Sequence, residues 1–89
     1  MIFFGALGAS FKVATTNIDN IKEAGTWLVP SDYVEGVPDG FYVQLTMTVI
    51  KTSAGDIIQT IYRTGGGGKM AMRTSASAST WNAWKVIVS

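Results

Sequence analysis

A ten-residue alternation of side chains is the feature that most limits how this chain can fold. One set of alternate positions is apolar and the other is mostly polar. The apolar set is Phe41, Val43, Leu45, Met47 and Val49, and the other set is Tyr42, Gln44, Thr46, Thr48 and Ile50. A period of two places successive side chains on opposite faces of a β-strand. The pattern therefore predicts a strand from Phe41 to Lys51, with one face in a core and a hydroxyl-rich face outward.

Turn-forming residues border this strand on both sides. Pro38-Asp39-Gly40 precedes it, and Ser53-Ala54-Gly55-Asp56 follows it, so the chain should return from Asp56 to Arg63 as an antiparallel partner. Further short strands are expected at Thr26–Val29, which Pro30 stops, and at Lys69–Thr74 and Lys85–Val88. The sequence thus predicts about five short strands in hairpin order.

The segment from Asn17 to Gly25 has the features of one short helical turn. Asn17 or Asp19 could cap its free N–H groups, and Glu23 lies at a capping-box distance from Asn20. Gly25 would end the turn in a left-handed conformation. The predicted fold class is therefore mainly β, with a minor α component: a small, knob-like antiparallel sheet of about five strands with one short N-terminal helical turn.

The core of this sheet should combine large apolar side chains from the strands and from the helical turn. The side chains expected inside are Phe41, Val43, Leu45, Met47, Val49, Ile18, Ile21, Trp27 and one or both of Trp81 and Trp84.

Composition excludes several kinds of chemistry. The chain has no Cys and no His, which removes disulfides, thiol catalysis and the commonest general base and metal ligand. Asp39 and Asp56 lie in turns, where an Asp side chain satisfies local backbone groups. We therefore expect no enzyme, no catalytic residue, no metal and no cofactor. Residues 51–89 carry five cations against Asp56 alone, too few and too dispersed for a nucleic-acid partner.

The N-terminal residues MIFFGALGASF are apolar and spaced by glycines. No Lys or Arg precedes them, unlike in a secretory signal, and the run is shorter than the ~20 apolar residues that cross a bilayer. We expect no membrane insertion. Apolar surface without a core of its own usually belongs to an interface. We therefore assign residues 1–16 to the end of a stalk or to an oligomer seam, and residues 17–89 to the knob-like β domain.

Six motifs in order resemble the knob-like domain of phage and pyocin tail fibres. The resemblance extends from Asn17 to Val88. Its motifs are Asn17-Ile18-Asp19-Asn20-Ile21, Gly25-Thr26-Trp27-Leu28-Val29, Pro38-Asp39-Gly40 with the strand Phe41 to Ile50, Gln59 with Tyr62, Lys69-Met70-Ala71-Met72-Arg73, and Trp81-Asn82-Ala83-Trp84-Lys85.

The resemblance implies a non-enzymatic module of a phage tail fibre or tail tip, which attaches to glycan on the host surface. It implies a homotrimer within the virion, in a tail fibre or baseplate and extracellular. The implied partners are bacterial cell-surface polysaccharide and other tail or baseplate proteins. One alternative is a structural trimerisation or spacer knob without ligand binding, and another is an unrelated protein with a small carbohydrate-binding domain.

Five polar or aromatic side chains are the candidate ligand-binding site. Sugar hydroxyls need donors and acceptors beside a flat ring, and charged groups strengthen these hydrogen bonds. The best cluster on the expected outward faces is Tyr62, Arg63 and Arg73, with Gln44 and Gln59 nearby if the two central strands pair. The alternative is that Tyr62 is a core ring and both Arg side chains are solvated.

Overall fold

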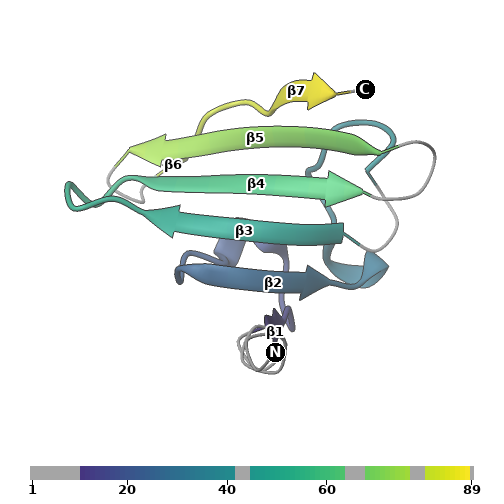
Figure 1. Ribbon diagram of the computed structural model, residues 1–89, viewed down its shortest axis with the longest axis horizontal. Helices are drawn as coiled ribbons and strands as arrows, with labels where there is room; N and C mark the ends of the chain where they lie inside the picture. The colour runs from purple at the N-terminus through teal and green to yellow at the C-terminus, as the bar shows by residue number, and fades with distance from the viewer. Residues whose placement is uncertain (1–10, 42–44, 64–67, 77–79, 89) are drawn as a thin grey trace, which may run out of the picture.

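One seven-stranded sheet organises the described residues of the computed structural model, which are 11–41, 45–63, 68–76 and 80–88 (Figure 1). The strands are β1 (Phe11–Val13), β2 (Gly25–Val29), β3 (Leu45–Lys51), β4 (Ile57–Arg63), β5 (Lys69–Ala76), β6 (Thr80–Trp81) and β7 (Lys85–Val88). Two short 3-10 helices, η1 (Ile18–Asn20) and η2 (Ser31–Tyr33), complete the elements. The mainly β fold class is confirmed.

The central hairpins follow the predicted alternation and turns. Strands β3, β4 and β5 pair antiparallel in chain order. In the turn between β3 and β4, the Thr52 N–H donates to the Asp56 carbonyl at 2.9 Å, and the Asp56 N–H donates to Thr52 Oγ1 at 3.1 Å. Gly55 in this turn has a φ of 92°, a conformation that glycine adopts without a steric penalty. The predicted hairpin is therefore confirmed.

The sheet differs from the prediction at its two ends. It is mixed rather than wholly antiparallel, because β1 pairs parallel with β2. It has seven strands rather than about five, because β1 forms one edge while β6 and β7 both pair with β5. Residues 11–13 of the segment assigned to a stalk or seam thus lie in the sheet. Residues 1–10 lie outside the described residues, and their assignment stays a prediction.

The helical turn is shorter than expected and is not capped as predicted. The helix η1 spans three residues, and Asn17 makes no side-chain hydrogen bond at its N-terminus. Glu23 does not form a capping box, because the neighbouring strand β1 brings Lys12 close and the two side chains form an ion pair at 2.6 Å. Gly25, with a φ of 147°, begins β2 instead of ending a helix.

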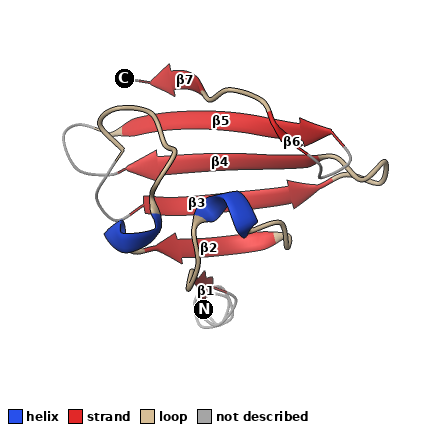
Figure 2. Ribbon diagram, turned by 180° about the vertical axis from the view of Figure 1, so that it is seen from behind, coloured by secondary structure: helices blue, strands red, loops and turns tan. Residues whose placement is uncertain are grey.

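The two faces of the sheet differ in what covers them. We call the face covered by η1, η2 and the loop that follows η2 the inward face; these elements lie in front of the sheet in Figure 2. The opposite, outward face of β2 to β5 is turned toward the viewer in Figure 1, and no described element crosses in front of it.

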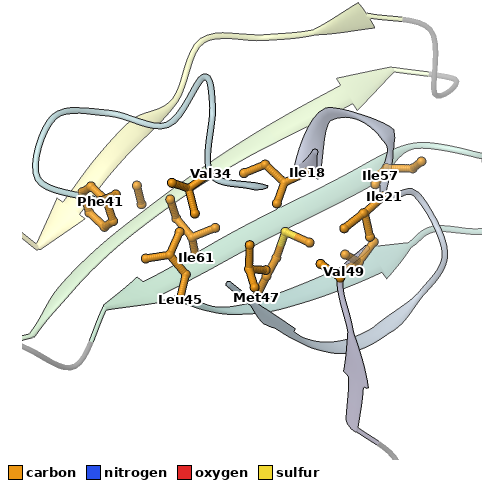
Figure 3. Packing of buried hydrophobic residues seen from close by; sticks show 12 residues of the cluster. Ile18, Ile21, Val34, Phe41, Leu45, Met47, Val49, Ile57 and Ile61 are labelled. Carbon is orange, nitrogen blue, oxygen red and sulfur yellow. The ribbon is translucent and has the colours of Figure 1, made fainter. Parts of the chain in front are cut away.

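The core lies between the inward face and its covering elements (Figure 3). The buried members of the predicted core are Ile18, Ile21, Phe41, Leu45, Met47 and Val49, which confirms these six positions. Val43 lies outside the described residues. The side chains of Trp27, Trp81 and Trp84 pack against the cluster but are only partly buried. Ile57, Ile61 and Ala71 complete the inward side of β4 and β5.

Truncation of the core should destabilise the fold strongly. Met47 is fully buried, so Met47→Ala should lower the free energy of unfolding by about 2–5 kcal/mol through lost burial and a residual cavity. Ile87→Ala, at a side chain that is half exposed in β7, should cost less than about 1 kcal/mol. Urea denaturation of both variants measures the difference, and equal losses would contradict this description of the core.

Candidate functional site

The structure separates the five predicted site residues. Tyr62 points outward and is 41% exposed, as predicted. Gln59 and Arg73 lie on the inward face with 0% and 7% exposure, so their predicted outward position is wrong. Arg63 lies on the same side of β4 as Gln59 and donates from Nη1 to the Gly40 carbonyl at 2.8 Å. Gln44 lies outside the described residues.

The pleat of the strands explains this separation. Gln59 and Arg73 are direct cross-strand partners, so their side chains share one face. Tyr62 is three residues after Gln59, an odd number, which places it on the opposite face. The sequence predicted the pairing of neighbouring strands but assigned β4 and β5 residues of both faces to one site.

Arg73 is the centre of a buried polar cluster. Its guanidinium carbon lies 4.2 Å from the ring centroid of Trp81 and 4.4 Å from that of Trp84. Arg73 Nε donates to Gln59 Oε1 at 2.8 Å, and Arg73 Nη2 donates to Asp19 Oδ1 at 2.8 Å. We call these five residues the Arg73 cluster. The guanidinium is thus held by an amide, a carboxylate and two aromatic rings.

The other members of the Arg73 cluster bind the backbone of the elements that cover the sheet. Gln59 Nε2 donates to the carbonyls of Ile18 and Ile21 at 2.7 and 2.9 Å. Trp81 Nε1 donates to the Asp19 carbonyl at 3.0 Å. The cluster therefore fastens η1 to the centre of the sheet.

The second ring of the cluster holds a different segment. Trp84 Nε1 donates to the Gly36 carbonyl at 2.8 Å, which fastens the loop after η2. Burial lowers the pKa of Arg73, and the hydrogen bond and charge of Asp19 oppose that shift. Each polar side chain of the cluster thus has a partner within the fold, so the cluster has a structural role.

Two hollows lie along β5, and we call them the β5 hollows. The first has a volume of about 260 Å³ and is lined by Thr52, Asp56, Ile58, Thr74, Ser75, Ala76 and Asn82. The second has a volume of about 280 Å³ and is lined by Met72, Arg73, Thr74, Ala83 and Lys85. Thr74 lines both hollows, so they adjoin each other.

The β5 hollows combine hydrogen-bonding groups with apolar surface. Asn82 Nδ2 donates to Thr74 Oγ1 at 3.0 Å, and the Asn82 N–H donates to the Thr74 carbonyl at 2.9 Å. These bonds fix an amide and a hydroxyl side by side. Ile58 and Met72 supply apolar walls, and the exposed Lys85 adds a positive charge. Such a mixture suits an uncharged or anionic polar ligand with some apolar surface, such as a sugar chain.

The β5 hollows were not predicted from the sequence. Asp56 was expected only as a turn residue, Asn82 only as part of the last of the six motifs, and Lys85 as part of that motif and as the start of a strand. One signal was present: a period of two along the predicted strand Lys69–Thr74 puts Met70, Met72 and Thr74 on one face. The return of the C-terminal segment alongside β5, which brings Asn82 to Thr74, has no comparable signal in the sequence.

Comparisons with known proteins identify no relative. A scan against protein-family models gives no match, and searches of curated proteins and of solved structures also give none. Within the described residues, no helix is long and apolar enough to span a membrane. The described part of the chain also holds no group of three or more acidic, His or Cys side chains arranged to bind a metal.

Removal of the Gln59 amide should destabilise the fold through groups left unpaired. In Gln59→Leu, the Ile18 and Ile21 carbonyls lose a donor and Arg73 Nε loses its acceptor. Because a buried unsatisfied polar group costs about 1–3 kcal/mol, we expect the free energy of unfolding to fall by at least about 2 kcal/mol.

The control for this experiment is Asn20→Ala, which removes an exposed amide with one side-chain hydrogen bond. It should change the free energy of unfolding by less than about 0.5 kcal/mol. A Gln59→Leu variant as stable as the parent in urea denaturation would contradict the structural role of the Arg73 cluster.

Proposed function

We propose that this chain is a non-enzymatic module of a phage tail fibre or tail tip, which attaches the particle to polysaccharide on the bacterial surface. The observation that supports this proposal is the composition of the Arg73 cluster. Its members come from four of the six motifs on which the resemblance to tail-fibre knob domains is based. These members are Asp19, Gln59, Arg73, Trp81 and Trp84.

The meeting of these motifs matters because they are far apart in the sequence. Asp19 and Arg73 are separated by 54 positions, and Asp19 and Trp81 by 62. If the motifs matched by chance, their residues would have no reason to meet around one guanidinium. Residues that together stabilise a fold do lie close to one another. Related domains keep such residues, which then appear as the motifs of the family. The convergence therefore supports the resemblance, and the attachment function rests on it.

The β5 hollows are the surface that we assign to the polysaccharide. Hydrogen bonds orient the amide of Asn82 and the hydroxyl of Thr74 toward each other, and apolar side chains lie beside them. Lys85 would attract an anionic wall polymer, and salt would weaken that attraction. Tyr62 stays a candidate contact, because its exposed ring pairs across the strands with Met70, close to the second hollow.

The alternative function is a structural trimerisation or spacer knob without a ligand. The Arg73 cluster favours it to the extent that its polar groups serve the fold. We propose for either function a homotrimer in the virion, next to other tail or baseplate proteins. Retention by a host surface distinguishes the two, because a spacer would not be retained.

Adsorption of the labelled chain to bacterial cells and to purified wall polysaccharides tests the proposal. The parent should be retained by at least one cell type. Asn82→Ala and Thr74→Val each remove one polar group of the hollows and should weaken retention at least about fivefold, since a lost hydrogen bond is worth about 1 kcal/mol or more. Lys85→Gln should also weaken retention and reduce its dependence on salt.

The matched control is Lys12→Gln, which removes a partly exposed cation in β1, toward the opposite edge of the sheet from the β5 hollows, and should leave retention unchanged. Circular dichroism establishes that each variant is folded. Retention of all three hollow variants at the level of the parent would remove the β5 hollows as the attachment surface. Absence of retention of the parent by any cell type would favour the spacer function.

A further inference from the structure

The outward face of the sheet carries no charged side chain on its first four strands. Cross-strand pairing assigns ten described positions to this face, and all are apolar or hydroxyl-bearing. They are Phe11, Val13, Thr26, Leu28, Thr46, Thr48, Ile50, Ile58, Thr60 and Tyr62. In an antiparallel sheet with one face on a core and the other in water, the face in water usually carries polar and charged side chains. We call these ten positions the neutral face.

The large apolar side chains of the neutral face are open to solvent. Phe11, Val13, Leu28, Ile50 and Tyr62 are between 39% and 58% exposed. No described element covers the neutral face, whereas helices and a loop cover the opposite face (Figures 1 and 2). Exposed apolar patches of several hundred Å² on a soluble protein usually mark a contact surface.

Three of the five exposed side chains lie in one cross-strand row. Val13 pairs with Leu28, Leu28 pairs with Thr46, and Thr46 pairs with Tyr62. This row crosses four strands, from the edge strand β1 to the middle of the sheet. A parallel row joins Phe11 to Thr26, Thr48 and Thr60.

We propose that the neutral face is the surface through which copies of this chain associate. A face without charge can be applied to its own copy without like-charge repulsion, whereas recognition of a different protein commonly uses complementary charges. Depletion of charge and presence of aromatic side chains are also what distinguish the core of a protein interface. A second neutral face packed about 10 Å away would remove both from water.

The area of the neutral face agrees with a second copy of the chain as its partner. With about 150–250 Å² for a large side chain, its five large residues expose about 400 Å² in each copy. Two copies would thus bury about 800 Å² from these residues alone, and the threonines add to it. The total approaches the lower limit of about 1,000 Å² for a specific interface.

The course of the chain also favours a second copy of the chain as the partner. The described residues begin at Phe11, which lies on the neutral face and directly follows the apolar sequence 1–10. Residues 1–16 are predicted to form the end of a stalk or an oligomer seam; as a seam, they would continue directly into the neutral face along the chain. The β5 hollows adjoin the neutral face along β5, and Ile58 belongs to both surfaces, so the part of the neutral face on β1 to β3 is the part that lies away from the hollows.

Light scattering coupled to size-exclusion chromatography tests this proposal on the whole chain. At micromolar concentration the parent should elute with the mass of two or more chains, each of 9.5 kDa. Val13→Lys and Leu28→Lys each place a charge on the neutral face and should reduce the mass to that of one chain. Both positions are exposed in the single chain, so circular dichroism should show an unchanged fold.

Val86→Lys is the matched control. Val86 also lies in an edge strand and is 45% exposed, but it pairs with the buried Ala71 and therefore lies on the inward side of the sheet. The Val86→Lys variant should keep the mass of the parent. A monomeric parent, or a multimer that persists in both Val13→Lys and Leu28→Lys, would overturn the proposal.

The mass from light scattering and the retention by cells test different proposals. A multimer that dissociates as expected, yet is not retained by any cell, would support the neutral face and contradict polysaccharide attachment. A monomer that is retained by cells would contradict the neutral face as an association surface and support polysaccharide attachment. A dimer would support the neutral face and contradict the homotrimer.

Discussion

The fold depends on the burial of Arg73 in a protein of 89 residues. A buried guanidinium is costly unless charge and hydrogen bonds compensate it. Compensation by Gln59 requires β4 and β5 to pair in one register, and compensation by Asp19 requires η1 to lie over the middle of the sheet. One side chain thus constrains a strand register and the docking of a helix, because a shift in either would leave its charge unpaired.

The same interaction determines the path of the C-terminal segment. The strand β6 has only two residues and β7 only four, all four of them exposed, so their ladders and burial contribute little. Trp81 and Trp84 instead hold this segment, because both rings stack on the guanidinium and both indole N–H groups reach backbone carbonyls. Truncation of either ring would remove packing and a hydrogen bond at once, which makes these residues more important than their partial exposure suggests.

Much of the sheet could be predicted from the sequence because its signals are local. The alternation that begins at Phe41 and the turn before Asp56 were sufficient to predict β3, its inward positions and its pairing with β4. The inward position of Arg73 could not be obtained in this way, since an arginine in an alternating strand is ordinarily expected in water. Its burial depends on Asp19, a residue 54 positions away, and no local pattern encodes that contact.

The edge strands of the sheet could not be predicted from the sequence for a different reason. The strand β1 has three residues, too few for a period to be recognised, and it pairs parallel with a strand that begins twelve positions after it ends. Its position depends on contacts made after folding, such as the ion pair of Lys12 with Glu23. The β5 hollows were missed on similar grounds, because they arise where the C-terminal segment returns to Thr74.

The two faces of the sheet depart from the usual distribution of charge. Gln59 and Arg73 lie inside, whereas the outward positions of β1 to β4 hold no charge among the described residues. The inward arrangement makes the sheet rigid, because a satisfied polar cluster tolerates few alternative packings. A rigid sheet with a neutral outer face is suited to repeated contact with a copy of itself, since neither partner must reorganise or desolvate a charge. The cluster that holds the fold and the face proposed for assembly are therefore opposite sides of the same strands.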